Sequence, residues 1–314
     1  MPVSIHVAVG VIFADDGRVL VAKRPPEVHQ GDLWEFPGGK LEAGETVLQA
    51  LQRELEEELG IQVDPTRCFP FRKISHCYED RSVLLDVWRV NGYRGDAQSR
   101  ENQPLAWCRP EQLDPLKFPA ANNDIIRLLQ LPGFIAITPA CNSQAEFIQA
   151  IERMLARGIR LIQIRQPNLP LETVRQWVEV ARQLCDPLNT RIMVNTSLDW
   201  FRHCSGHGLH LSALRLMTCR QRPVTEEQLF SASCHNSAEL AQAERLGADF
   251  VLVSPVQATA SHPGADILGW SGFQSLVSRF SIPAYALGGL SETDLELARQ
   301  AGALGIASIS AFSH

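Results

Sequence analysis

The stretch from Gly38 to Ile61 constrains this 314-residue chain more than any other part of it. It begins as a glycine-rich loop and continues into a segment in which leucines recur at helical spacing. Thr46 followed three residues later by Gln49 is a capping-box pattern, and Gly60 suits the left-handed position that follows a helix. The pattern therefore predicts one helix between Thr46 and Gly60. Its expected buried stripe consists of Val47, Leu48, Leu51, Leu55 and Leu59.

The other face of this predicted helix is acidic. Glu54, Glu57 and Glu58 are three and four residues apart, which places them on one face. Like charges at this spacing repel one another, and a bound cation removes the repulsion. Carboxylate oxygens suit Mg²⁺ or Mn²⁺. Glu45 can reach the same place, and Arg53 can pair with a glutamate and fix its orientation. The alternative is a solvated acidic face without a ligand.

This stretch resembles the Nudix box, G-x5-E-x7-R-E-U-x-E-E-x-G-U, in which U is an apolar residue. All of its constrained positions are matched, by Gly39, Glu45, Arg53, Glu54, Leu55, Glu57, Glu58, Gly60 and Ile61. The resemblance implies a pyrophosphohydrolase that uses Mg²⁺, or alternatively Mn²⁺, as its cofactor. It implies metal ligation by Glu54, Glu57 and Glu58 with the backbone of Gly39, and it places Arg53 among the catalytic residues.

Residues 3–131 are also similar to the MutT-type branch of this family, the 8-oxo-dGTP diphosphatases. The matching stretches are Lys23-Arg24, residues 34–40 and residues 118–122. The resemblance implies hydrolysis of 8-oxo-dGTP to 8-oxo-dGMP and pyrophosphate, which cleans the nucleotide pool and serves DNA repair and replication. Its implied substrate-binding residues are Arg24, Phe36, Gly38, Gly39, Lys40 and Asn122.

Two points stay open within this resemblance. Arg24 and Asn122 are expected at the oxidised purine, but a surface cation and a helix N-cap are the alternatives for these residue types. The family also has a glutamate on a later loop near the metal ions, matched here by Glu101. Either Glu101 or one of the helix glutamates is expected to deprotonate the attacking water.

The first 131 residues alternate between strand and turn patterns. Apolar alternation predicts a strand over residues 3–14, a hairpin turn at residues 15–17 and a partner strand over residues 18–23. Further strands are expected at 68–74, 82–90 and 105–108, with a surface loop over residues 92–105 and a helix over about 122–131. A mixed sheet with helices on both faces, an α/β/α sandwich, is the expected packing.

Leu131-Pro132-Gly133 is the predicted domain boundary, which gives domains of residues 1–131 and 132–314. Short apolar strands then alternate with amphipathic helical segments. The expected strands are 134–138, 160–165, 191–195, 208–211, 229–234, 250–254, 284–287 and 305–308, and helices are expected at 143–157, 171–186, 237–246 and 291–301. Eight such units predict a TIM (β/α)₈ barrel, with a doubly wound sheet as the alternative.

The second half, over residues 134–312, resembles thiamine-phosphate synthase and the TenI-type thiazole tautomerase. The resemblance implies a phosphate site for a thiamine-related ligand. It comprises Gln163, Arg165, Asn195, Thr259, Gly289 and Ser308. The chain departs from the synthase where that enzyme has acids and lysines for Mg²⁺ and pyrophosphate. The departures are Gln166-Pro167, Thr196, Ser212-Ala213 and Ser261-His262.

These departures predict a barrel without synthase activity. The alternatives are a bifunctional enzyme with synthase or tautomerase activity in the barrel, and a barrel that binds a ligand without catalysis.

Overall composition limits the partners. The formal net charge of −6 argues against binding to polymeric nucleic acid but not against a nucleoside triphosphate. No apolar run is long enough to span a bilayer, so a soluble, cytoplasmic protein with no membrane partner is expected. The eight scattered cysteines are expected to be reduced. His203, Cys204, His207 and His210 form a zinc-like cluster, but a buried strand over residues 208–211 fits this segment better.

Overall fold

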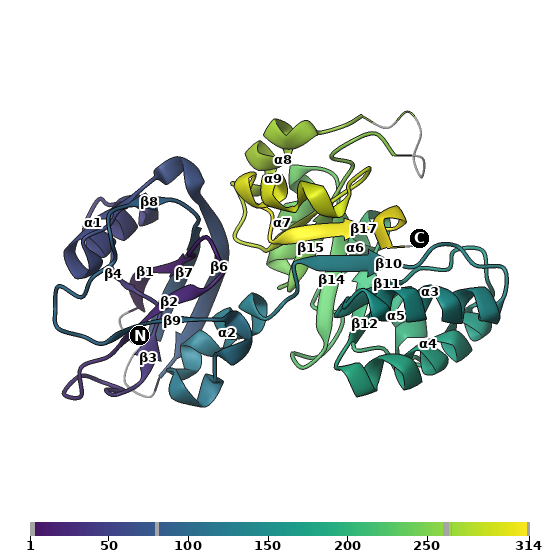
Figure 1. Cartoon of the computed structure of the whole chain (residues 1–314), viewed down its shortest axis with the longest axis horizontal. Helices are drawn as coiled ribbons and strands as arrows, with labels where there is room; N and C mark the ends of the chain where they lie inside the picture. The colour runs from purple at the N-terminus through teal and green to yellow at the C-terminus, as the bar shows by residue number, and fades with distance from the viewer. Residues whose placement is uncertain (1–3, 79–81, 260–263, 265, 313–314) are drawn as a thin grey trace. The chain divides into compact units, whose positions relative to one another are not determined.

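The computed structural model describes residues 4–78, 82–259, 264 and 266–312. The chain divides into two compact units, Met1–Leu131 and Pro132–His314 (Figure 1). None of the helices in the described ranges is long and apolar enough to cross a membrane.

The N-terminal unit is made of short strands and two α-helices among its described residues. In chain order its elements are β1 (Ser4–Ile12), β2 (Val19–Lys23), β3 (Trp34–Glu35), β4 (Gly38–Lys40), α1 (Val47–Leu59), β5 (Gln62–Val63), η1 (Pro65–Arg67), β6 (Cys68–Cys77), β7 (Ser82–Val90), β8 (Tyr93–Arg94), β9 (Leu105–Cys108), η2 (Pro110–Gln112), η3 (Pro115–Lys117), η4 (Ala120–Asn122) and α2 (Asn123–Leu129). The mixed character of the sheet and the helix near residue 122 agree with the sequence analysis.

The main sheet has the strand order β4-β1-β7-β6, in which β1 and β7 are parallel and the other pairs are antiparallel. The turn predicted at residues 15–17 is present, since the Ala14 N–H donates to the Arg18 carbonyl at 2.9 Å, but the predicted pairing of the two strands beyond it is wrong. β2 pairs instead with β3 and β9 in a second sheet, and a single bridge, Phe13 to Val19, joins it to the first strand. The reason is that β4 and β7 already occupy both edges of β1. The predicted loop over 92–105 also contains β8, which pairs with β5.

Helix α1 forms as its sequence predicts. Thr46 and Gln49 make both bonds of the capping box, and Gly60 ends the helix in the left-handed conformation with φ of 70°. Leu51, Leu55 and Leu59 are fully buried in the core that the helix shares with the strands. This packing fixes the helix on β1, β4 and β5, with Glu54 and Glu58 beside the β4 glycines and Glu57 exposed.

The C-terminal unit is a closed eight-stranded barrel. Its elements are β10 (Phe134–Ile137), α3 (Gln144–Ala156), β11 (Leu161–Ile164), α4 (Leu171–Cys185), η5 (Asp186–Leu188), β12 (Arg191–Asn195), α5 (Leu198–Phe201), β13 (Gly208–Leu211), α6 (Ala213–Thr218), β14 (Leu229–Cys234), α7 (Ser237–Arg245), β15 (Phe250–Val253), α8 (Gly269–Val277), β16 (Ala284–Leu287), η6 (Glu292–Asp294), α9 (Leu295–Gln300), β17 (Gly305–Ser308) and η7 (Ser310–Phe312).

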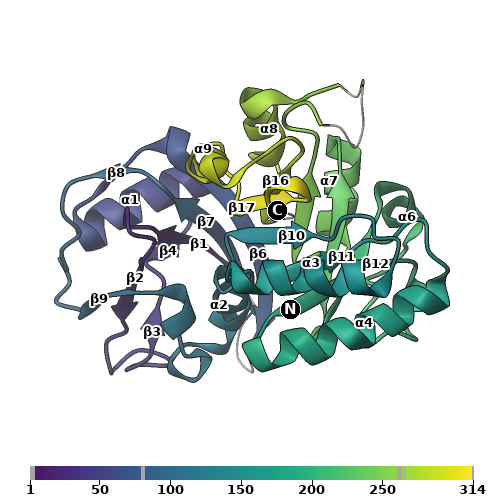
Figure 2. The ribbon, with the colours of Figure 1, turned by 45° about the vertical axis from the view of Figure 1, so that its right-hand side comes forward.

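The strands of the barrel are parallel and follow chain order, and β17 pairs with β10 to close it. Helices surround the barrel, and Figure 2 shows α3 and α4 side by side on its outside. The predicted (β/α)₈ fold is confirmed, and closure excludes the doubly wound alternative. Helices α5, α6 and α8 had no predicted range, because two are very short and the third contains two glycines.

Candidate active site

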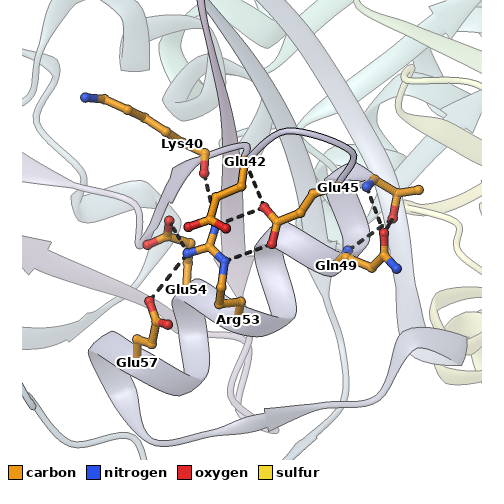
Figure 3. Close-up of polar contacts among 8 residues, drawn as sticks. Lys40, Glu42, Glu45, Gln49, Arg53, Glu54 and Glu57 are labelled. Carbon is orange, nitrogen blue, oxygen red and sulfur yellow. Dashed lines mark hydrogen bonds and ion pairs between the residues drawn. The ribbon is translucent and has the colours of Figure 1, made fainter.

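Arg53 on α1 joins the helix to the loop before it. Its Nε and Nη2 donate to the two carboxylate oxygens of Glu45 at 2.8 and 2.9 Å, and Nη2 also donates to the Lys40 carbonyl at 3.1 Å (Figure 3). Its Nη1 donates to Glu54 at 2.8 Å and to Glu57 at 3.4 Å. The Arg53 hydrogen bonds lower the pKa of Glu45 to about 2. The expected pairing of Arg53 with a glutamate is thus present, with Glu45 as the bidentate partner.

Glu58 is a half-buried member of the acidic face. Its Oε2 accepts a hydrogen bond from the Gly38 backbone N–H at 3.3 Å. Burial raises the pKa of Glu58 to about 8, with smaller contributions from the negative charges of Glu35, Glu54 and Glu101, although the Gly38 bond opposes the shift. The negative charges of Glu35, Glu54 and Glu101 thus act on Glu58, and a cation there would offset them.

The glycine pair of the loop makes room for these carboxylates. An ideal Cβ on Gly39 would lie 2.1 Å from the carboxyl carbon of Glu54, so a larger residue would displace that carboxylate. Gly38 has φ of 142°, and a Cβ there would lie 2.1 Å from the Ala8 carbonyl oxygen. The two glycines let the backbone approach both the sheet and the acids.

The donors gathered here fit a hard divalent cation, because all of them are oxygens. Within the described residues, however, no three His, Cys, Asp or Glu side chains converge closely enough to form a coordination shell. Glu57 lies to one side, with 58% of its side chain exposed and its carboxylate on Arg53. The structure therefore brings the predicted ligands into one region but not onto one point.

Arg24 and Asn122, the two residues expected at the base, are partly ordered by protein contacts. The Arg24 guanidinium is paired with Glu35 and donates to the His29 carbonyl at 2.9 Å, with 24% of the side chain exposed. It is therefore not a free surface cation. Asn122 is 8% exposed and stands at the N-cap position of α2, but its side chain makes no capping hydrogen bond. Phe36 is buried and stacks on Phe118, with ring centroids 5.7 Å apart.

Tyr78 is a member of this region that the sequence analysis missed. Burial raises its pKa, while a hydrogen bond from the backbone of Ala121 and the charge of Arg24 lower it, so both groups act on the phenol. Its ring also contacts the rings of His29 and His76 edge to face. It lies outside every stretch that carried the resemblance, so no local pattern pointed to it. Lys40, in contrast, has its side chain pointing away from the carboxylates (Figure 3).

The six residues expected to bind phosphate in the barrel all lie at or near the carboxyl ends of strands, on the rim where barrel enzymes bind ligands. They are Gln163, Arg165, Asn195, Thr259, Gly289 and Ser308. Ser308 is buried, and its hydroxyl donates to the Leu290 carbonyl and accepts from the Ala311 N–H. A Cβ on Gly289 would lie 2.3 Å from the Ala258 carbonyl oxygen, so this glycine allows two rim loops to touch.

Gln166 occupies a position where the resemblance expects an acid or a lysine. It is buried, and its amide nitrogen donates to the Thr138 hydroxyl and the Pro139 carbonyl, while its oxygen accepts from the Cys141 N–H. The side chain is a link between two rim loops and not a phosphate ligand. Thr196 is also buried. The departure at residues 261–262 lies outside the described residues.

The histidines near residue 205 do not share a site. His210 on β13 points into the barrel, where its two ring nitrogens contact the hydroxyls of Ser231 at 2.8 Å and Ser233 at 2.9 Å. His207 accepts from the Ile192 N–H through Nδ1 and faces Asp186 through Nε2. The segment over residues 208–211 is the predicted strand.

Comparison with known proteins separates the two units. Residues 8–128 match the family model of the NUDIX domain, and residues 134–312 match that of thiamine monophosphate synthase. The 8-oxo-dGTP diphosphatase of Escherichia coli is 36% identical over 127 residues, which are 40% of this chain and 97% of that protein. The chain belongs to both families. Its N-terminal unit is a Nudix hydrolase, and its C-terminal unit is a thiamine-phosphate-synthase-like barrel.

Two further relatives show the same division. The CTP pyrophosphohydrolase of Escherichia coli is 40% identical to the Nudix unit over 134 residues, 42% of this chain and 95% of that protein. The thiamine-phosphate synthase of Fusobacterium nucleatum is 23% identical over 172 residues, 54% of this chain and 83% of that protein. Each relative thus matches one unit across most of its own length.

Proposed function

We propose that the Nudix unit hydrolyses 8-oxo-dGTP to 8-oxo-dGMP and pyrophosphate with Mg²⁺, and thereby keeps an oxidised guanine nucleotide out of DNA. The observation that supports the proposal is the contact of Glu54 and Glu58 with the Gly38-Gly39 backbone, while the negative charge of Glu101 acts on Glu58. When bound, Mg²⁺ supplies charge that polarises phosphoryl oxygens and stabilises the leaving pyrophosphate. Gly39, Glu54, Glu57, Glu58 and Glu101 are the proposed ligands.

The protein's own residues position the reactants. Water attacks one phosphorus, the phosphoanhydride bond to pyrophosphate breaks, and the proton of the water passes to a carboxylate of the site. Arg53 holds the loop and Glu54 in place through its hydrogen bonds to Glu45 and Glu54. Gly38 and Gly39 allow the backbone to approach the phosphates closely, and Lys40 offers a flexible cation for them.

The nucleobase of the substrate has to be argued from the residues, because the relatives of the Nudix unit include both an 8-oxo-dGTP diphosphatase and a CTP pyrophosphohydrolase. Arg24, Phe36, Tyr78 and Asn122 support a purine, since they combine two aromatic rings with groups that donate and accept hydrogen bonds. Asn122 can pair with a donor and an acceptor on the purine edge at once.

The decisive experiment measures kcat/KM for 8-oxo-dGTP, dGTP, CTP and dCTP with Mg²⁺. We expect 8-oxo-dGTP to be hydrolysed at least about tenfold more efficiently than the others. The Asn122→Leu variant should lose this preference while it retains turnover of dGTP. If CTP is preferred, the base assignment is wrong. If no nucleotide is hydrolysed, the whole proposal for this unit fails.

For the barrel we propose a proton-transfer reaction on a phosphorylated thiazole in place of the synthase reaction. His235, which follows β14 at the ligand rim, donates from Nδ1 to the Ser254 carbonyl at 2.7 Å, because a carbonyl can only accept. This bond fixes the tautomer in which Nε2 carries the lone pair, as a general base requires. The reaction only moves a proton within the substrate, so it needs no pyrophosphate and none of the acids that Gln166 and Thr196 replace.

Nuclear magnetic resonance can follow exchange of the migrating proton of a thiazole phosphate carboxylate in deuterated buffer. We expect exchange with the full-length protein and none with the His235→Gln variant. Formation of thiamine phosphate from thiazole phosphate and pyrimidine pyrophosphate would contradict the proposal and favour the synthase. Binding without exchange would favour a ligand-binding module.

A further inference from the structure

The loop that carries Glu101 is attached to the C-terminal end of α1. After β8 pairs with β5, the chain turns back over the helix end. The Gln98 N–H donates to the Leu59 carbonyl at 3.0 Å, and the Arg100 N–H donates to the Glu58 carbonyl at 2.9 Å. The last carbonyls of a helix have no partner within the helix. Here the loop supplies partners for two of them.

The side chain of Arg100 adds a third attachment. Its Nη1 donates to the Glu56 carbonyl at 3.0 Å. The guanidinium thereby places a positive charge at the negative end of the helix dipole, where a cation is favourable. Arg100 is exposed to solvent and has no role in the hydrophobic core. Its contacts are all directed at the helix end.

Gly60 provides the surface on which the guanidinium rests. An ideal Cβ at this position would lie 2.7 Å from Nε and 2.8 Å from Nη2 of Arg100. Any other residue would push the guanidinium away. The last glycine of the motif thus has two functions, since it also ends the helix with φ of 70°. Ending the helix is a local function, whereas the contact with the guanidinium depends on a residue 40 positions later in the chain.

We infer that Arg100 is a positioning residue of the hydrolase, which docks on Gly60 and the last turn of α1 and so holds Glu101 beside Glu58. Glu101 is its immediate neighbour in the chain, and its negative charge acts on Glu58. The loop has no other side-chain hydrogen bond to α1 among the contacts described here. This inference rests on the proposed function of the Nudix unit, in which Glu101 takes part.

The test compares variants of the full-length protein with 8-oxo-dGTP and Mg²⁺. Arg100→Met keeps the apolar stem and removes the charge and the donors, whereas Arg100→Lys keeps the charge. Arg94→Met is the matched control, because it removes an exposed arginine from the same segment without touching the helix end. Circular dichroism and thermal unfolding of each variant confirm that it is folded. If Arg100→Met does not fold, Arg100→Gln replaces it.

We expect Arg100→Met to lower kcat about tenfold with KM within about twofold of wild type, and Arg100→Lys to restore most of the loss. Gly60→Ala should reproduce the loss, because its Cβ displaces the guanidinium. The decisive comparison is made in the Glu101→Gln background. There Arg100→Met should have no further effect, because a residue that acts only through Glu101 has nothing left to position. An equal loss in both backgrounds would overturn the inference.

A second measurement separates this inference from the proposed function. Electron paramagnetic resonance of free Mn²⁺ reports metal binding without any nucleotide. We expect Arg100→Met and Glu101→Gln each to weaken Mn²⁺ binding about tenfold, and Arg94→Met to leave it unchanged. Unchanged binding in Arg100→Met would overturn the inference. A wild-type protein that binds Mn²⁺ but hydrolyses no nucleotide would refute the proposed function alone, and one that binds no Mn²⁺ would refute both.

Discussion

The two units present their polar side chains in opposite ways. In the Nudix unit, one contiguous stretch of loop and helix supplies most of the candidate site. There Arg53 bridges Glu45 and Glu54, and Glu58 accepts from the Gly38 N–H. In the barrel, the candidate residues come from separate strand ends, and Ser308 among them is held by protein partners, as is Gln166 on the same rim. Carboxylate oxygens gathered on one helix suit a hard cation. A satisfied residue at a family position indicates a structural role.

The largest effect that this comparison predicts is the loss of a carboxylate from the Nudix site. Glu58→Gln should lower kcat at least a hundredfold, about 3 kcal/mol of transition-state stabilisation, because it removes a metal-binding charge. The free energy of unfolding should stay the same or rise, since the amide relieves repulsion from Glu35, Glu54 and Glu101. Steady-state kinetics and chemical denaturation measure the two quantities. Glu56→Gln on the same helix is the control, and turnover near wild type in Glu58→Gln would remove the basis of the comparison.

The two units should respond to pH with opposite signs. The folded pKa of Glu58 is about 8 against an ordinary 4.5, so between these values only the folded state binds this proton, and the Nudix unit loses stability as pH rises. Burial lowers the pKa of His210 from 6.5 to about 3, so below pH 6.5 only the unfolded state binds this proton, and the barrel loses stability as pH falls. Each group changes the free energy of unfolding by up to about 1.4 kcal/mol per pH unit.

Hydrogen exchange of the full-length protein, followed by mass spectrometry in a chelator, resolves the two units. Between pH 7.5 and 5, after correction for intrinsic rates, protection should increase in α1 and decrease in β13 and β14. Glu58→Gln should reduce the pH dependence of protection in the Nudix unit and leave the pH dependence in the barrel unchanged. A response of the same sign in both units would contradict this prediction.

Gln166 tests the idea that a departure from the family pattern has a structural cause. Gln166→Ala removes three hydrogen bonds between two rim loops and leaves the Cys141 N–H without its partner. We expect the barrel to lose about 2 kcal/mol of stability. Thermal unfolding measures the loss, with Gln176→Ala on the outside of α4 as the control. Gln166→Glu should not create synthase activity, and unaltered stability in Gln166→Ala would mean that the side chain is available for a ligand.

The smallest expected effect comes from separating the units. A fragment of residues 1–131 should fold and keep kcat/KM for its nucleotide within about threefold of the full-length protein, because the motif and the core under it belong to this unit alone. The comparison uses both proteins at equal concentration. A folded fragment with more than about tenfold lower kcat/KM, roughly 1.4 kcal/mol, would show that the barrel contributes to the hydrolase site.

Local patterns determined much of this protein. The helix α1, its capping box and Gly60 follow from residue spacing within a few turns, and the barrel follows from repeated strand and helix patterns. The helix and the individual strand and helix segments depend on interactions between residues that are near one another in sequence. Closure of the barrel does not, because it pairs β10 with β17 from the two ends of the unit.

The tertiary structure decided what depends on distant residues. It placed β2 in a second sheet because both edges of β1 were occupied, and it brought Tyr78 under the influence of Arg24 and the Ala121 backbone. It also left Glu58 half-buried and Glu57 exposed, although both lie on the same predicted helix face. A carboxylate's environment is set by the groups that pack around it, and those groups come from other parts of the chain.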